Sequence, residues 1–256
     1  MTEAAQLPAQ SRSVFDSTSR TPAARLGVAV VKDLVEAIVT GEVPSGAVLP
    51  PEGILSQQFG VSRTVIRESV KRVEEKGLVI VAQGRGTTVN PPNSWNVLDP
   101  VVLSALIDHD DSLGVLDDLA VVRGSLEASM AAAAAARRTP VRTQELTDAY
   151  ERMVSTIDDV DAYNQADMDF HVVVMEQSGN RLAANITEIL FLRARDSSRF
   201  AVRPTTEWLH MTLDEHHAVR EAIEQMDPQA AAQAMEKHIT DAWARRRLPN
   251  HRRDGF

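Results

Sequence analysis

Apolar residues in the first third of the chain recur with helical spacing and are interrupted by glycine. From Leu26 to Ile38 they return every third or fourth residue and Gly41 follows, a pattern typical of an amphipathic helix with a glycine C-cap. Ser62 is a good N-cap for a later helix, which Gly77 stops. The pattern therefore predicts three helices, over residues 26–38, 52–59 and 63–76.

Two short runs rich in β-branched residues follow the third predicted helix. Residues 78–81 and 87–89 flank the Gly-rich turn 83–86, which predicts a β-hairpin. Helix, short helix, turn, helix and hairpin is the element order of a winged helix-turn-helix. The sequence thus predicts a DNA-binding domain over residues 25–91, preceded by a mobile tail over 1–24.

The remainder of the chain has a helical pattern throughout. Residues 26–100 contain eight Gly and six Pro, whereas residues 115–247 contain two Gly and three Pro, so long helices replace short elements. Seven helices are predicted, over residues 99–107, 115–137, 142–156, 160–178, 181–200, 206–226 and 228–247. We expect a mainly α protein in which a linker over 92–98 leads to an all-α bundle of six or seven helices over 99–247, with a tail over 248–256.

Composition and charge narrow the functional classes. None of the 256 residues is cysteine, which excludes disulfide frameworks, thiol nucleophiles and Cys-ligated zinc. No apolar run approaches the ~18–20 residues of a membrane span. The first twenty residues lack a signal-peptide pattern, so we expect a cytoplasmic protein without a membrane partner. The net charge of −9 argues against a nucleic-acid partner. However, residues 1–94 hold 10 Lys and Arg against 9 Asp and Glu, leaving 17 against 27 for the helical half.

Basic residues line one side of the third predicted helix. Arg63, Arg67 and Lys71 repeat every fourth residue, while apolar residues on the neighbouring arc seat the helix on its domain. Such a helix places its N-terminal residues near base edges of the major groove, and Arg85 at the hairpin tip reaches a phosphate or the minor groove. A lone basic pair would indicate only a solvated surface, but a serine cap, a basic stripe and a hairpin occur together here. The predicted DNA-binding residues are Ser62, Arg63, Thr64, Arg67, Lys71, Gly84 and Arg85.

Three of the predicted bundle helices carry metal-ligand side chains on their apolar faces. Asp167 and His171 lie four residues apart, and His216 and His238 lie on the apolar stripes of two later helices. Taken singly, each histidine is typical of a packed, hydrogen-bonded core residue, and an Asp-x-x-x-His pair is a weak signal. Taken together, they are costly to bury unpaired, and one divalent cation would satisfy all four. The residues alone leave both interpretations open.

Two stretches of the chain resemble known families. The DNA-binding domain of GntR-family transcription regulators is similar to residues 48–90, through Leu49-Pro50-Pro51-Glu52, Ser62-Arg63-Thr64, Ile66-Arg67-Glu68 and Gly84-Arg85-Gly86. One departure is Gly53, where the family usually has an arginine that contacts DNA. The resemblance therefore implies weaker or altered operator binding for this chain.

The second resemblance is to the FCD effector domain of FadR-type GntR regulators. It rests on Arg123-x-x-x-Glu127, Asp167-x-x-Phe170-His171, Ser178-Gly179-Asn180, His216 with Ala222-Ile223, and His238. It implies that Asp167, His171, His216 and His238 hold a divalent metal ion inside the bundle. Three imidazoles and one carboxylate suit Zn, Ni or Mn.

Four protein ligands on an octahedral ion would leave two positions for a small carboxylate or hydroxy acid. Arg123 shares a stripe with apolar residues, Thr212 lies one turn before a histidine ligand, and Arg245 lies two turns after another. These three are the predicted effector anchors. Alternatively, Arg123 pairs only with Glu127, Thr212 bonds to its own helix, and Arg245 belongs to a surface cluster.

The predicted function is a DNA-binding transcription regulator, most often a repressor in this family. A homodimer would bind a near-palindromic operator, and a small organic acid would modulate the binding. The segment Trp95-Asn96-x-Leu98-Asp99-Pro100 resembles the linker of members that respond to sugar acids. The rival interpretation is a metal-dependent hydrolase that uses the His3Asp site. No general base is identifiable for such an enzyme, and it leaves the first 90 residues without a role, so we expect no enzymatic activity.

Overall fold

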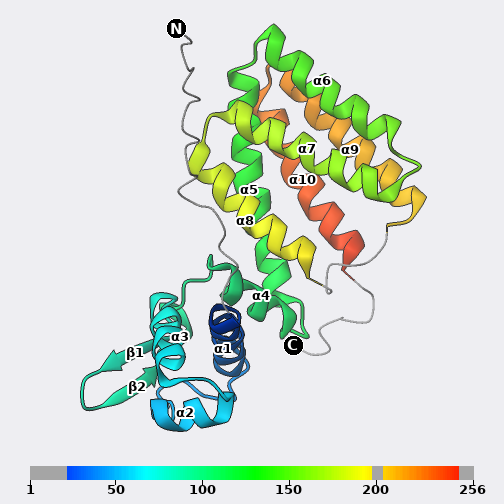
Figure 1. The fold of residues 1–256 in the computed structure, drawn as a ribbon. Coiled ribbons are helices and arrows are strands. Elements are labelled where there is room, and N and C mark those ends of the chain that lie inside the picture. The colour runs from blue at the N-terminus through cyan, green and yellow to red at the C-terminus, as the bar shows by residue number, and fades with distance from the viewer. Residues whose placement is uncertain (1–21, 198–203, 248–256) are drawn as a thin grey trace, which may run out of the picture. The chain divides into compact units, whose positions relative to one another are not determined.

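The computed structural model describes residues 22–197 and 204–247, which form two compact units that divide between Trp95 and Asn96 (Figure 1). This division falls inside the segment 92–98 that the sequence predicts as a linker. The predicted tails lie outside the described residues, except that the first helix already begins at Pro22.

The first unit is built from three helices and a two-stranded sheet. Its elements are α1 (Pro22–Val39), α2 (Glu52–Phe59), α3 (Arg63–Glu75), β1 (Val79–Ala82), β2 (Gly86–Val89) and the 3-10 turn η1 (Pro92–Ser94). Helices α1 and α2 both pack against α3. The buried core of the unit includes Val35 of α1, Leu55 of α2, Ile66 and Val73 of α3, and Val89 of β2. Leu26, predicted on the buried stripe of α1, is 48% exposed because this turn of α1 extends beyond the core.

The predicted hairpin is present, as an antiparallel pair of β1 and β2. Val79 pairs with Val89 and Ala82 with Gly86, and the turn between them includes Gly84 at φ +73°, a conformation that favours glycine. The backbone N–H of Leu49 donates to Thr87 (2.8 Å), which extends the sheet by a short third segment. The predicted winged helix-turn-helix is therefore confirmed.

The chain leaving the hairpin is held against the first unit. Gly77 has φ +79°, and a Cβ atom there would lie 2.3 Å from the carbonyl oxygen of Ser94. The Asn90 amide donates to the Gly77 carbonyl (2.9 Å), and the Trp95 indole N–H donates to the Asn90 carbonyl (3.1 Å). Residues 90–95 therefore belong structurally to the first unit.

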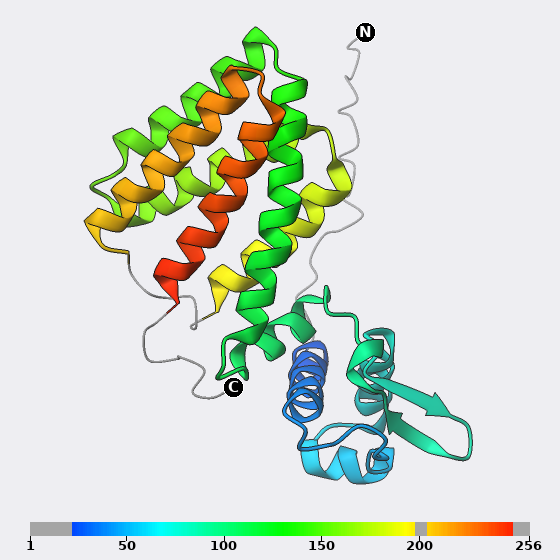
Figure 2. The same ribbon diagram turned by 180° about the vertical axis from the view of Figure 1, so that it is seen from behind.

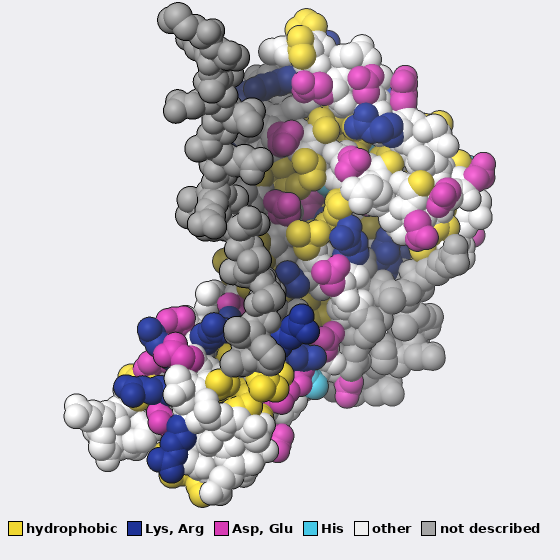
Figure 3. Space-filling model, viewed as in Figure 1, with side chains coloured by type: hydrophobic (Ala, Val, Ile, Leu, Met, Phe, Trp, Pro, Cys, Tyr) yellow, Lys and Arg dark blue, Asp and Glu magenta, His cyan; other side chains and the backbone are white. Residues whose placement is uncertain are grey.

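The second unit is an all-α bundle. Its helices are α4 (Pro100–Asp108), α5 (Gly114–Ala136), α6 (Pro140–Ser155), α7 (Val160–Ser178), α8 (Arg181–Asp196), α9 (Thr206–Glu224) and α10 (Pro228–Arg246). Helices α5 and α10 run side by side, and α9 lies against α10 and α6 (Figure 2). The predicted helix over 181–200 ends at Asp196, and its last residues lie outside the described part. Acidic side chains are scattered over the face of this unit seen in Figure 3.

Helix α5 lies at the centre of the bundle and is the one helix in the described ranges that is long and apolar enough to cross a membrane. The sequence contains no uninterrupted apolar run of that length, because charged residues such as Arg123 and Glu127 interrupt the stretch in α5. Half of the stretch is buried within the bundle, and it carries the buried charged side chains of Arg123 and Glu127. These features are typical of the core helix of a helical bundle.

Helices α4, α5 and α8 share an apolar cluster of their own. We call it the α4–α5–α8 cluster, and its buried members are Leu103, Ile107, Leu113, Leu116, Leu119, Leu190 and Ala194. Leu113, at the corner between α4 and α5, has φ +60° although it is not glycine. Such a conformation costs about 1 kcal/mol or more, and packing of the side chain in the cluster offsets it.

The Ser178-Gly179-Asn180 motif forms the corner between α7 and α8. Gly179 has φ +70°, and a Cβ atom there would collide with the guanidinium of Arg137, which donates to the Ser178 carbonyl (2.5 Å). The Asn180 side chain accepts from the backbone N–H of Ala183 and so caps α8. The corner therefore fixes the C-terminal end of α7, the helix that carries Asp167 and His171.

Candidate metal centre, effector cavity and DNA-binding surface

Helices α7, α9 and α10 bring one carboxylate and three imidazoles to a single point. Ligand atoms of Asp167, His171, His216 and His238 all lie within 4.8 Å of one another. The His171 Nε2 atom lies 3.3 Å from that of His216 and 3.2 Å from that of His238. Asp167 Oδ1 lies 3.4 Å from His216 Nε2. The three histidines are buried and Asp167 is half-buried, so the cluster is closed to bulk water on most sides.

The second nitrogen of each imidazole is bound by an acceptor of the protein. His171 Nδ1 faces Glu127 Oε2 (2.5 Å), His216 Nδ1 faces the Thr212 carbonyl (2.7 Å), and His238 Nδ1 faces Glu215 Oε2 (2.9 Å). Carboxylates and carbonyls only accept, so each Nδ1 carries the hydrogen and each neutral ring points a lone pair from Nε2 at the other two.

The surroundings of the site favour the unprotonated, metal-binding form of Asp167, His216 and His238, but not of His171. Burial and the neighbouring imidazoles lower the pKa of His216 to about 3, and burial also lowers the pKa of His238. Burial alone would raise the pKa of Glu127 and of Asp167, but Arg123 and His171 beside Glu127, and the three histidines beside Asp167, hold both pKa values below the usual range. The Glu127 carboxylate outweighs burial and raises the pKa of His171.

The arrangement fits a metal ion. With all three rings neutral and protonated on Nδ1, three buried lone pairs converge with no donor between them, which is unfavourable unless a cation lies among them. Two nitrogens that each lie ~2.1 Å from one cation are roughly 3.0–3.4 Å apart for bond angles between 90° and 109°. The two spacings between His171 Nε2 and the other histidines, 3.3 and 3.2 Å, fall in that range. The hydrogen bond behind each ring is the arrangement that orients histidine ligands in metalloproteins.

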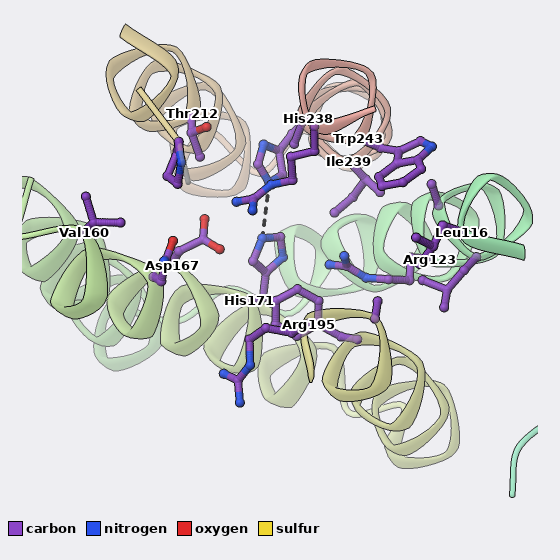
Figure 4. A pocket seen from close by; sticks show the side chains of 18 of the residues that line it. Leu116, Arg123, Val160, Asp167, His171, Arg195, Thr212, His238, Ile239 and Trp243 are labelled. Atoms are coloured by element: carbon purple, nitrogen blue, oxygen red, sulfur yellow. Dashed lines mark hydrogen bonds between the residues drawn. The ribbon is translucent and has the colours of Figure 1, made fainter. Parts of the chain in front are cut away.

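A cavity of about 340 Å³ opens beside the cluster (Figure 4). Asp167, His171 and His238 line it, and so do the predicted anchors Arg123 and Thr212. The Arg123 guanidinium is buried, ion-paired with Glu127 (2.7 Å) and stacked over the Phe191 ring at 4.3 Å from its centre. Arg123 is therefore a fixed cation beside the metal ligands.

The third predicted anchor, Arg245, lies differently from the expectation. Its guanidinium forms a bidentate pair with Glu215 (2.6 and 2.7 Å) and donates to the Thr212 hydroxyl (3.3 Å). Arg246 lines the main cavity instead, as does Arg195 of α8. Arg245 thus supports the carboxylate that orients His238, because Glu215 accepts from both.

The first unit carries exposed cationic side chains on α3 and on the turn of the hairpin. Arg63, Arg67, Lys71 and Arg85 are exposed, and none of these side chains has an ion pair or hydrogen bond within the described ranges. The Ser62 hydroxyl accepts from the backbone N–H of Val65 (3.4 Å) and so caps α3. Most arginines of the bundle have protein partners, so this surface differs from the second unit.

Gly53 gives room to one of these cations. An added Cβ atom at Gly53 would lie 3.3 Å from Arg63 Nη2 and 3.7 Å from Arg63 Cζ. The guanidinium of Arg63 therefore rests on the first turn of α2, at the residue where the resemblance places an arginine.

Comparison with known proteins decides the family. Residues 26–89 match the gntR family of bacterial regulatory proteins, and residues 118–241 match the FCD domain. The galactonate operon transcriptional repressor of Escherichia coli strain K12 is 30% identical over 205 residues, which cover 80% of this chain and 90% of that protein. The chain belongs to the GntR family.

Other relatives of this GntR-family regulator agree. The transcriptional repressor NanR of Cronobacter sakazakii is 27% identical over 241 residues, 91% of each chain. Among solved structures, the Lar protein that controls the expression of the Listeria monocytogenes agr system has a TM-score of 0.54 at 17% identity, and the match covers 86% of this chain and 96% of that one. This last match supports the fold alone.

The protein is thus a transcription regulator and not an enzyme, as the sequence predicts. GntR-family regulators bind DNA operators, and FCD domains generally bind a metal, for which this chain has the His3Asp group.

Sequence reasoning missed Glu215 and Arg246. Glu215 sits off the apolar stripe of α9, so no periodicity marks it. Arg246 lies eight residues after His238 on α10, about 80° away from it around the helix, so helical spacing did not mark it either.

Proposed function

We propose that this regulator is a homodimeric repressor whose affinity for a near-palindromic operator falls when a small carboxylate binds at the metal site of its second unit. The observation that carries the effector half is the convergence of three lone pairs and Asp167 beside a cavity with fixed guanidinium groups. We place the protein in the cytoplasm, where operator DNA is accessible.

The DNA half of the proposal rests on the unpaired cations of α3 and the hairpin. Arg63, Thr64 and Arg67 at the start of α3 would contact base edges, while Lys71 and Arg85 would contact phosphates. We expect Arg67→Ala to abolish specific operator binding without changing the melting temperature. Arg72→Ala removes the same charge from another side of α3 and serves as the control. Fluorescence anisotropy with a selected operator measures both, and equal losses in the two variants would contradict the groove assignment.

The dimer half rests on exposed apolar side chains of α5 and α8, which pack against each other. Val121 and Val122 of α5 are 70% and 44% exposed, and Leu182 of α8 is 72% exposed. Ile189 of α8 is also exposed. We take these exposed apolar side chains on neighbouring helices as the candidate interaction surface, and a second copy of the chain is the partner that a palindromic operator requires. Val122→Asp should yield a monomer in sedimentation, whereas Val141→Asp on α6 should not. A dimer in both variants would place the interface elsewhere.

Asp167, His171, His216 and His238 would hold the metal, with Zn, Ni or Mn as the ions that suit these ligands. When bound, the ion would act as a Lewis acid that receives carboxylate or hydroxyl oxygens of the effector. Arg123 would pair with the effector carboxylate, and Thr212 would position His216 and donate a hydroxyl to the cavity. Glu127 and Glu215 would orient His171 and His238.

The decisive experiment compares operator affinity with and without organic acids for the wild type and for His216→Ala. The variant removes one ligand far from α3 in sequence and leaves the DNA-binding surface unchanged. We expect the variant to bind the operator with wild-type affinity and to contain less metal by elemental analysis. When acid is added, its operator affinity should not fall. One relative is named for a galactonate operon, so galactonate and the related gluconate belong in the panel. Full metal content and full response in the variant would refute the site.

A further inference from the structure

The cavity beside the metal ligands has two sides of opposite chemistry. On one side of the cluster lie Asp161, Asn164 and Thr212, which offer hydrogen-bonding groups. On the other side, beyond Arg123, lies a wall of apolar side chains from α5, α8 and α10, which we call the apolar arm: Leu116, Leu119, Ala120, Phe191, Ile239 and Trp243. Figure 4 shows Leu116, Ile239 and Trp243 gathered on this side and Val160 and Thr212 on the opposite side.

The polar atoms nearest the apolar arm are already used by the protein. The Trp243 indole N–H donates to Asp117 Oδ1 (2.8 Å), and the other oxygen of Asp117 accepts from Arg247 (2.8 Å). The indole therefore offers a ligand its ring and not its donor. The Arg123 guanidinium donates from Nε and Nη2 to Glu127 and covers Phe191 with its face. Arg123 thus stands between the metal ligands and the apolar arm. Of the other cations that line the cavity, Arg246 lies on the side of Asn164 and Thr212, and Arg195 points away from Leu116 and Trp243 (Figure 4).

This asymmetry selects the chemical class of the effector. A carboxylate bound between the metal ligands and Arg123 directs the substituent on its far side into the apolar arm. Hydroxyl groups on that substituent would lose water without gaining partners, whereas methylene groups would gain contacts. We propose that the effector is an amphipathic hydroxy acid or carboxylic acid with a short aliphatic or aromatic tail, and not a fully hydroxylated sugar acid. This inference rests on the proposed function, because it assumes that the cavity binds an acid.

The apolar arm also connects the ligand to α4. Leu116 and Leu119 belong to the α4–α5–α8 cluster, in which they pack with Leu103 and Ile107 of α4. Helix α4 is the first helix after the division between the two units. A tail in the apolar arm therefore contacts the side chains that seat α4, whereas a head group alone does not.

Three acids with the same 2-hydroxycarboxylate head test the proposal on the zinc-loaded full-length protein. Lactate has the head alone, 2-hydroxyhexanoate adds three methylenes, and gluconate has six carbons with a hydroxylated tail. Each buried methylene strengthens binding about fourfold, so full burial of three gives up to about 60-fold. We expect calorimetry to give 2-hydroxyhexanoate at least about tenfold tighter binding than either lactate or gluconate.

Two variants locate the tail. Ala120→Leu fills the apolar arm from a half-buried position, and it should reduce the preference for 2-hydroxyhexanoate over lactate to about twofold or less. Ala244→Leu adds the same atoms at an exposed position of α10 and should keep the preference of the wild type.

The outcomes separate the two levels of the argument. Tighter binding of gluconate than of 2-hydroxyhexanoate overturns the inference and leaves an acid-binding regulator. An unchanged preference in Ala120→Leu, with wild-type melting behaviour, also overturns it. Absence of binding by all three acids, together with an operator affinity that no acid changes, refutes the proposed function itself.

Discussion

Glu215 is predicted to tune metal affinity without touching the metal. Its Oε2 atom accepts from His238 Nδ1 (2.9 Å), and both of its oxygens accept from Arg245 (2.6 and 2.7 Å). Glu215→Gln keeps the size of the side chain but removes the negative charge. The amide cannot satisfy His238 and both nitrogens of Arg245, because one end of it is a donor.

The expected loss has two parts. Loss of an acceptor behind a histidine ligand typically lowers metal affinity by about 10–100-fold, or about 1.4–2.7 kcal/mol. The ion pair with Arg245 has side chains 13% and 14% exposed, between the buried and the surface case. Breaking a buried pair costs about 3–5 kcal/mol and breaking a surface pair at most about 1 kcal/mol, so about 2 kcal/mol is expected here. For a domain of this size that corresponds to a melting temperature lower by about 4–8 °C.

A zinc-competition titration against a chelating dye measures the first part, and thermal unfolding with EDTA measures the second. Glu221→Gln, on an exposed side of α9, removes the same charge and should change neither. Zinc should raise the melting temperature of Glu215→Gln less than that of the wild type at equal zinc concentration. A variant that loses stability but keeps its zinc affinity within twofold would show that Glu215 only partners Arg245.

Three further predictions concern the cap of α5, the core and the DNA surface. Asp110 accepts from the backbone N–H groups of Ser112 and Val115, and although burial opposes them, the Ser112 hydroxyl and these N–H groups hold its pKa below the ordinary 3.8. Asp110→Ala should therefore cost about 1 kcal/mol in urea unfolding at pH 7, and the difference from the wild type should vanish as the pH falls below 3.8 through the lower pKa of the folded state, whereas a persistent difference in acid would contradict the cap. The buried hydroxyl of Thr187 has no hydrogen-bond partner among the described residues, so Thr187→Val should raise stability by about 1 kcal/mol, measured by the same unfolding, and a loss would mean that the hydroxyl is satisfied. Gly53→Arg must displace the Arg63 guanidinium, so operator selection should return a changed base preference, while Gly53→Ala, which meets only the end of that side chain, should keep the wild-type preference.

The sequence predicts that the four candidate metal ligands lie together, as they do in the structure, because each one lies on the apolar side of its own helix. Helical periodicity places Asp167, His171, His216 and His238 in the interior, and the resemblance states that they meet. Periodicity within one helix carries no information about contacts across helices. The role of Glu215 was therefore not predictable, because its partners His238 and Arg245 belong to another helix, α10.

The position of a residue around its helix did not suffice to predict the role of Arg245. Seven residues turn an α-helix by about 700°, which returns Arg245 to within about 20° of His238, whereas Arg246 is about 80° away. Phase alone therefore favours Arg245 for the side that faces the cavity. In the structure Arg245 forms an ion pair with Glu215, and Arg246 lines the cavity instead.

The close approach of Gly77 to Ser94 has a consequence for protein engineering. Chimeric biosensors are made by exchanging the effector domain of one regulator for another, and the position of the junction decides whether the parts still fold. A junction at Pro91, the end of the domain predicted from sequence, would replace Ser94 and Trp95 and would expose the Asn90 carbonyl and the surface over Gly77. A junction after Trp95 keeps these contacts with the DNA-binding part. Foreign effector domains should therefore be joined at Asn96.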